Sequence, residues 1–141
     1  MNYATFERAQ LARWAYLKAV HTGSLACMKA ICYVLRNRVQ AGWGEGLWLN
    51  VIENHCMMEG NEESGMRQPL DPADRLLQIL VRDIDDIYLG LSADDTELVV
   101  QDALYFQFID RPPRQWFVEH IIRDPENHAR IGQVGPIALF R

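Results

Sequence analysis

The residues of this sequence that best suit chemistry on a carbohydrate are its tryptophans and one nearby glutamate. Trp43 and Trp48 flank a glycine-bearing turn, where an aromatic face could lie against a sugar ring. Trp14 lies in a helical segment and is better suited to the core. Glu53 follows the turn, and glycosidic cleavage requires a carboxylic acid beside the leaving oxygen. Trp43 and Trp48 are therefore candidate ligand-binding residues, and Glu53 is the candidate acid.

The histidines and cysteines form no pattern typical of a metal or thiol site. The four histidines lack metal-ligand spacing, and the sequence contains no C-x-x-C motif. Cys56 directly follows His55, but a catalytic pair needs spatial rather than sequential adjacency. Cys32 falls at helical spacing with apolar neighbours, which is typical of a core thiol. We therefore expect no metal ion and no cofactor.

Several helices must position these residues. Apolar spacing and capping residues predict helices over 5–21 and 25–40, with Gly23 and Ser24 forming the boundary between them. The same signals predict a short helix over 47–53.

The second half of the chain begins with a polar segment over 57–70. Asp71 would then cap a further helix that has Pro72 at its first position and runs to about Leu89. Asp94 and its acidic neighbours are expected to cap a short helix after Ser92.

Strands are expected at the end of the chain. The aromatic segment 103–109 predicts a strand, and 137–140 predicts a final short one. Residues 116–122 fit either a second strand or a short amphipathic turn. Because helices come first and strands last, the sequence predicts an α+β fold with a small antiparallel sheet near the C-terminus. The length suits a single domain over 1–141.

Composition and charge exclude some classes of protein. The chain has 141 residues, is 49% hydrophobic and 23% charged, and carries a net charge of −5. Residues 71–141 hold seven basic and thirteen acidic groups, which argues against nucleic acid as a partner. No apolar run is long enough to span a membrane, and no secretory signal is recognisable. We therefore expect a cytoplasmic protein, with export possible only by a non-classical route.

Four short segments, spread over nearly the whole chain, follow the order and spacing of motifs in a known family. The best match is VLRNRV at 34–39, followed by ALYF at 103–106. Weaker matches are YLKAVHTG at 16–23 and the ending that begins RIG at 130–132. In these segments the chain resembles the SleB-type (spore-cortex-lytic) cell wall hydrolases. That resemblance implies a lysozyme-like fold and a cleft for peptidoglycan, with Lys18, Tyr105 and Gln107 as further ligand-binding candidates beside the tryptophans.

The catalytic glutamate of that family has no counterpart here. Its position falls at Lys18, or at Ala19 with a different placement of the following loop, and no Asp or Glu occurs between Arg8 and Gly44. A lysine ammonium has a reference pKa of about 10.4, far above that of a useful proton donor. Glu7 cannot replace it, because eleven residues of helix separate the two by about 16 Å. We therefore expect no catalytic residue.

Three functions remain open. The first is a catalytically degenerate wall-hydrolase-like domain, a pseudoenzyme that binds a peptidoglycan fragment or a protein partner. The second is an active peptidoglycan hydrolase or lytic transglycosylase that uses Glu53 as a relocated carboxylate. The third is a structural or assembly protein of a phage or mobile element.

Overall fold

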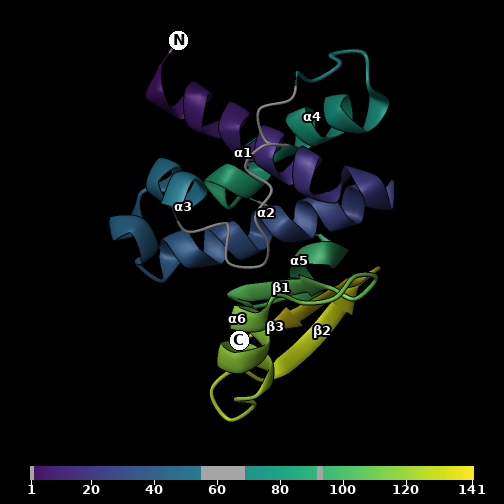
Figure 1. The fold of residues 1–141 in the computed structure, drawn as a ribbon. Coiled ribbons are helices and arrows are strands. Elements are labelled where there is room, and N and C mark those ends of the chain that lie inside the picture. The colour runs from purple at the N-terminus through teal and green to yellow at the C-terminus, as the bar shows by residue number, and fades with distance from the viewer. Residues whose placement is uncertain (1, 55–68, 92–93) are drawn as a thin grey trace.

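The longer helices occupy one part of the molecule, and a small sheet with the short helix α6, at Gln115–Phe117, occupies the other (Figure 1). The structure, a computed structural model, describes residues 2–54, 69–91 and 94–141. The neighbouring pair His55 and Cys56 and nearly all of the polar segment predicted over 57–70 lie outside the described residues. The expected α+β fold is confirmed, with an antiparallel sheet near the C-terminus.

The second helix has the bounds that the sequence predicted, and the first begins and ends two residues before its predicted bounds of 5–21. Helix α1 spans Tyr3–Ala19 and continues into a 3-10 turn, η1, at Val20–Thr22. Gly23 ends that turn in the left-handed conformation, with φ 62°, which glycine adopts without steric cost. The side chain of Ser24 then accepts a hydrogen bond from the backbone of α2, which spans Leu25–Gln40.

The remaining helices are shorter and surround α2. The 3-10 turn η2 at Trp43–Gly46 leads into α3 at Trp48–Asn54. Helix α4 spans Arg75–Leu89, and α5 spans Asp95–Val100 with Asp94 as its expected cap.

The start of α4 differs from the prediction. Its capping residue is Asp74, whose carboxylate accepts hydrogen bonds from the backbone N–H of Leu77 and from the hydroxyl of Tyr16. Asp71 instead accepts a hydrogen bond from the N–H of Ala73 within the preceding turn. The prediction of Asp71 was wrong because the tertiary contact with Tyr16 favours Asp74 at the cap. Gly90 ends the helix as expected.

Three strands form the sheet in the order β1-β3-β2, and all neighbours are antiparallel. The strands are β1 at Tyr105–Phe108, β2 at Arg130–Val134 and β3 at Ile137–Phe140. The sequence predicted β1 and β3 but missed β2. In β2 a register shift between Arg130 and Gly132 breaks the alternation that marks a strand.

Residues 116–122, predicted as a strand or a turn, are helical. They belong to α6 at Gln115–Phe117 and a π-helical turn, η4, at Val118–Ile122. The strand alternative is therefore wrong. Phe117 and Ile121, four residues apart, share one helical face and pack with Phe140 against the outer face of the sheet.

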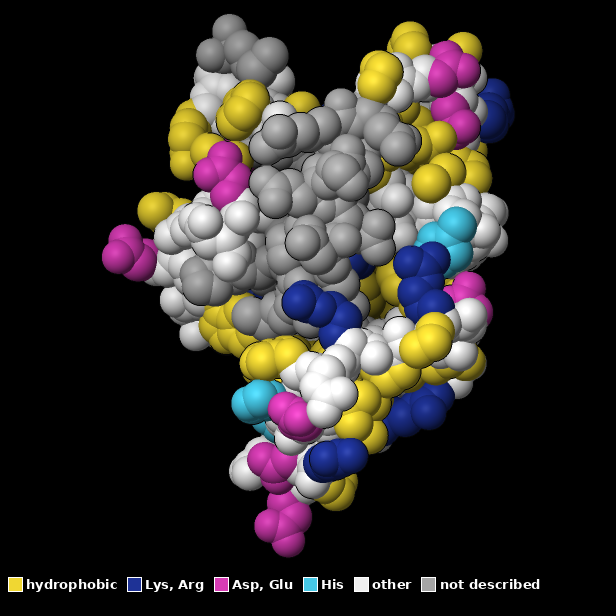
Figure 2. Space-filling model, in the orientation of Figure 1, with side chains coloured by type: hydrophobic (Ala, Val, Ile, Leu, Met, Phe, Trp, Pro, Cys, Tyr) yellow, Lys and Arg dark blue, Asp and Glu magenta, His cyan; other side chains and the backbone are white. Residues whose placement is uncertain are grey.

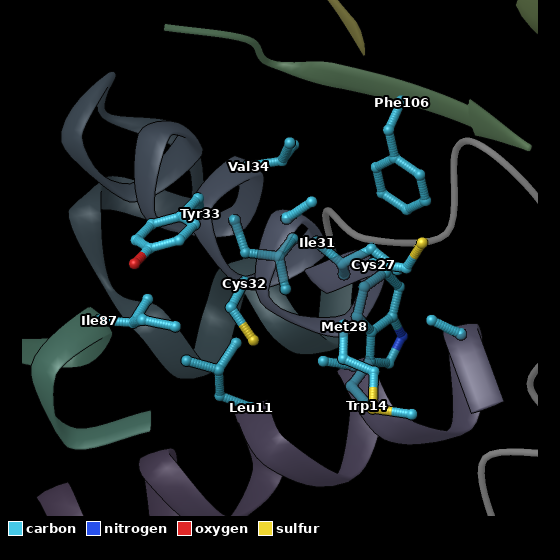
Figure 3. Packing of buried hydrophobic residues seen from close by; sticks show 14 of the residues in the cluster. Leu11, Trp14, Cys27, Met28, Ile31, Cys32, Tyr33, Val34, Ile87 and Phe106 are labelled. Atoms are coloured by element: carbon cyan, nitrogen blue, oxygen red, sulfur yellow. The ribbon is translucent and has the colours of Figure 1, made fainter. Parts of the chain in front are cut away.

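The core lies around α2, which contacts α1, α4, α5 and the sheet. Figure 3 shows Met28 of α2 beside Trp14 of α1, and Phe106 of β1 closing the cluster from the sheet side. The Trp14 and Phe106 rings meet edge to face, with centroids 6.3 Å apart. Cys32 is fully buried as expected, and burial raises the pKa of its thiol. Among the described residues, no helix is long and apolar enough to cross a membrane.

Candidate functional site

Lys18 lies in the last turn of α1 and is buried, with 4% of its surface exposed. Its Nζ lies 5.8 Å from the centre of the Trp14 ring, so the ammonium faces an aromatic surface. The end of a helix carries partial negative charge, which also favours a cation. Ala19, the other position for the missing acid, is fully buried in the core. Both positions thus contribute to packing.

The end of β1 lies against the turn that follows α1. The His21 and Phe108 rings meet edge to face, with centroids 4.8 Å apart. His21 Nε2 is 3.7 Å from Oδ2 of Asp110, which Arg111 approaches at 3.9 Å. Asp110 thus brings a carboxylate near the end of α1, but its side chain is 45% exposed. A general acid for glycoside cleavage is instead held in an apolar pocket.

Glu7 is a buried carboxylate with a structural role. Its Oε2 accepts a hydrogen bond of 3.0 Å from the backbone N–H of Leu49, in the first turn of α3. Its Oε1 accepts one of 2.6 Å from the hydroxyl of Tyr88 on α4. Burial, followed by these contacts with Glu7, raises the pKa of Tyr88 to about 12. Glu7 therefore joins α1 to α3 and α4.

Glu53, the candidate relocated acid, is exposed near the end of α3. Its neighbour Ile52 is buried, so the core-facing side of α3 is the side that carries Ile52 and not the side that carries Glu53. This arrangement is that of a solvated helix residue.

Trp43 and Tyr105, two of the predicted ligand-binding residues, lie together. Their ring centroids are 5.6 Å apart, and His128 meets Tyr105 from another side at 5.1 Å. The guanidinium of Arg38 lies 5.0 Å from the Trp43 ring and 5.8 Å from the Tyr105 ring. We call Trp43, Tyr105, His128 and Arg38 the aromatic cluster. Trp43 and Tyr105 are both half-buried, so part of each ring reaches the surface.

Trp48 and Gln107, also predicted to bind ligand, lie elsewhere. Trp48 stacks on the ring of Tyr88, with centroids 5.3 Å apart, at the junction of α3 and α4. Gln107 is buried on the outer face of the sheet, opposite Ala138. The five candidates therefore do not form one site: Trp43 and Tyr105 meet, and Gln107 lies on the same face of β1 as Tyr105, but Lys18 lies against Trp14 and Trp48 against Tyr88.

The best-matched motif, VLRNRV at the end of α2, binds the segment that leads into β1. Nδ2 of Asn37 donates hydrogen bonds of 2.9 Å to the carbonyls of Gln101 and Ala103. Nε of Arg38, a fully buried residue, donates one of 2.8 Å to the carbonyl of Leu104. Arg36 pairs with Glu97 of α5 at 2.6 Å. The motif is thus explained by structure alone.

Sequence reasoning missed a pocket on the outer face of the sheet. It has a volume of about 380 Å³ and is lined by residues of all three strands and their connections, including Gln107, Arg111, Ile122, Arg130 and Phe140. The signal was present in the alternation of β1, which places Tyr105 and Gln107 on one face and Phe106 and Phe108 on the other. We call this the sheet pocket.

Within residues 2–54, 69–91 and 94–141, no three His, Cys, Asp or Glu side chains are grouped so that they could hold a metal ion. Comparison with known proteins gave no match: no family model, curated protein or solved structure matches the chain. The resemblance to SleB-type hydrolases therefore remains a prediction.

Proposed function

We propose that this domain is a wall-hydrolase-like protein that binds a glycan, a peptidoglycan fragment, and does not cleave it. The observation that carries the proposal is Lys18. It occupies the position that the resemblance gives to the catalytic acid, and it is buried against Trp14 as a structural cation. A lysine cannot supply the raised-pKa carboxylic acid that glycosidic cleavage needs.

The described carboxylates nearest to this role do not replace the missing acid. Asp110 is half-exposed beside His21 and Arg111, and Glu53 is exposed on α3. Glu7 is buried, but both of its oxygens accept hydrogen bonds that hold α3 and α4. Each carboxylate is thus either open to solvent or engaged in the fold.

Glycan binding is supported by the aromatic cluster. Trp43 and Tyr105 offer two adjacent, partly exposed rings, and aromatic faces pack well against the apolar faces of sugars. Arg38 contacts both rings and His128 contacts Tyr105. The positions of the two rings are therefore largely preorganised before a glycan binds.

Two assays test the proposal. Purified protein incubated with insoluble peptidoglycan should co-sediment with it, and no muropeptides should be released above a buffer control, with an active lysozyme as positive control. Trp43→Leu should weaken co-sedimentation, whereas Trp116→Leu, a change at an exposed tryptophan outside the cluster, should not. The melting temperature of each variant shows whether it remains folded.

Each contrary result has a defined meaning. Release of muropeptides would overturn the proposal in favour of an active hydrolase, and Glu53→Gln and Asp110→Asn would then show which carboxylate acts. Absence of co-sedimentation would exclude glycan binding. Recovery of a stoichiometric protein partner in its place would favour an assembly role.

A further inference from the structure

The sheet pocket has the size and lining of a small-molecule site. Its volume of about 380 Å³ lies within the range of roughly 300–1,000 Å³ that small ligands occupy. Ala138 and Phe140 form an apolar floor, and Pro113 and Ile122 contribute apolar walls. Figure 2 shows that the lower part of the molecular surface, over the sheet and α6, mixes hydrophobic side chains with Lys or Arg side chains.

Gln107 gives this pocket an unusual polar group. Its Nε2 donates a hydrogen bond of 2.7 Å to the carbonyl of Phe108, which fixes the amide orientation, because a carbonyl can only accept. The other amide atom, Oε1, is buried, and nothing in the described part of the chain donates a hydrogen bond to it. The residue is only 6% exposed. A buried acceptor without a donor is unfavourable, so a ligand N–H would be stabilised there.

Two arginines complete the lining. Nη2 of Arg130 donates to the neutral amide of Gln133 at 2.6 Å, and Arg130 is exposed. Arg111 lies at the rim: its guanidinium is 5.1 Å from the centre of the Phe108 ring, on the other face of β1, and its Nε is 3.9 Å from Asp110. A guanidinium presents paired N–H donors whose geometry matches a carboxylate.

We propose that the sheet pocket binds the C-terminal end of a peptide. The last amide N–H donates to Oε1 of Gln107, the terminal carboxylate pairs with Arg130, and the last side chain packs on Phe140 and Ile122. An N–H donor and a carboxylate one carbon apart match a deep acceptor and a cation within one pocket. Because Oε1 has almost no contact with solvent, binding must rotate side chains that line the pocket.

This inference does not depend on the proposed function, because the pocket contains neither Lys18 nor Trp43. Its test uses the whole protein and two probes, N-acetyl-alanyl-alanine with a free carboxylate and the same dipeptide with a C-terminal amide. Binding is followed by isothermal titration and by shifts of the backbone amide signals in NMR spectra. The variants are Arg130→Gln and, as a matched loss of one exposed arginine outside the pocket, Arg123→Gln.

The free acid should bind and shift the signals of residues 107–109 and 138. Amidation and Arg130→Gln should each weaken binding by about tenfold or more, the effect of losing a hydrogen bond to a charged group. Arg123→Gln should bind like the wild type. Gln107→Leu should also weaken binding of the free acid, provided that its melting temperature shows a folded protein.

Three results would overturn the proposal. The first is no binding of the free acid at about 10 mM, a concentration above the dissociation constants of weak ligands. The second is equal binding of the free acid and the amide. The third is signal shifts confined to residues outside the sheet pocket. None of these results would affect the test of glycan binding at the aromatic cluster.

Discussion

Lys18 holds a cation in the last turn of α1, almost wholly removed from solvent. The Trp14 ring and the partial negative charge of the helix end both favour that cation. A glutamate at this position would place a negative charge against the aromatic face and against the negative end of the helix dipole. Both contacts would be unfavourable. A catalytic acid at Lys18 would therefore have to be compensated by other changes nearby.

We expect Lys18→Glu to lower the free energy of unfolding by roughly 2 kcal/mol, the sum of a lost cation–π contact and an unfavourable dipole interaction. Hydrolysis should not appear, because the resemblance also implies an Asn near Phe108 and a His near Val134 in the wall hydrolases, and neither side chain is present at those positions here. Chemical denaturation and muropeptide release measure the two effects. Lys18→Met is the control, since it keeps the apolar stem without the charge. Wall-degrading activity in Lys18→Glu alone would show that the rest of the site is intact.

Tyr88 and Glu7 form a partly buried hydrogen bond, and this contact makes the stability of the fold depend on pH. Burial and then the Glu7 carboxylate raise the pKa of Tyr88 from 10.0 to about 12. The folded state therefore keeps a proton that the unfolded state loses. The stability that this proton represents is fully present below pH 10 and is lost as the pH rises from 10.0 toward about 12.

Tyr88→Phe should reduce stability at neutral pH by about 1.5–3 kcal/mol, the contribution of a hydrogen bond to a charged group. It should also make the loss of stability above pH 10 less steep than in the wild type. Urea unfolding at a series of pH values measures both. Tyr3→Phe, at an exposed tyrosine, is the matched control. If the free energy of unfolding of Tyr88→Phe falls above pH 10 as steeply as that of the wild type, other tyrosines account for the alkaline loss of stability.

At the scale of elements, α2 organises the sheet through its last turns. Asn37 donates to two backbone carbonyls in the segment between α5 and β1. That segment includes Gln101, which has a φ of 51°, a conformation that non-glycine residues rarely adopt. The Asn37 amide helps to hold this turn and so sets where β1 begins.

Asn37→Ala should destabilise the protein by about 1–3 kcal/mol, because the partly buried carbonyl of Ala103 and the exposed carbonyl of Gln101 both lose their donor. Hydrogen exchange should rise first at the amides of β1, whose entry depends on this contact. Asn50→Ala is the control: Nδ2 of Asn50 also donates to a backbone carbonyl, that of Gly44, but far from β1. Equal exchange in β1 for both variants would contradict the role assigned to Asn37.

The cap of α4 provides a second test at this scale. Asp74→Ala should lower the melting temperature by more than Asp71→Ala, because Asp74 binds both Leu77 and Tyr16 while Asp71 closes a local turn. The hydrogen bonds from Tyr16 and Leu77 also lower the pKa of Asp74 below 3.8. If Asp71→Ala lowers the melting temperature more than Asp74→Ala does, Asp71 is the more important capping residue, as the sequence predicted.

At the scale of the whole molecule, cations of the first half pair with acids of the second. Nζ of Lys29 on α2 lies 2.6 Å from Asp94 and 3.7 Å from Asp83, which joins α2 to the cap of α5 and to α4. Burial works against the charged form of Asp94, but the hydrogen bonds from Lys29 and from the N–H of Glu97 outweigh it and lower its pKa. Arg36 and Glu97 form a similar link.

Stability should therefore be lost as the pH falls below 3.8, through the lowered folded pKa values of Asp74 and Asp94. Lys29→Met should reduce stability at pH 7 by roughly 1–3 kcal/mol, because two partly buried carboxylates lose a charged partner. The variant should also lose less on acidification than the wild type. Thermal unfolding between pH 7 and pH 3 measures this, with Arg123→Met, a change at an exposed arginine, as the control. Parallel acid curves for Lys29→Met and wild type would contradict the link.

Local signals in the sequence determined most of the elements. The spacing of apolar residues and the pair Gly23 and Ser24 gave α1 and α2, because helix periodicity and capping depend on neighbours in the chain. The sequence also predicted β1, from its aromatic residues, and the short strand β3. It predicted that Trp14 and Cys32 lie in the core, and both are buried. That the catalytic acid of the resembled family falls at Lys18 or Ala19 stays a prediction from the sequence.

The tertiary structure decided what no local pattern contains. Tyr16, distant in sequence, selected Asp74 as the cap of α4, and packing of Phe117 and Ile121 on the sheet made residues 116–122 helical. The tertiary structure also places the predicted ligand-binding residues in different surroundings. Trp43 contacts Tyr105, whereas Gln107 lines the sheet pocket. The physical reason is that burial and hydrogen-bond partners depend on which distant segments meet, and short-range periodicity carries no information about that meeting.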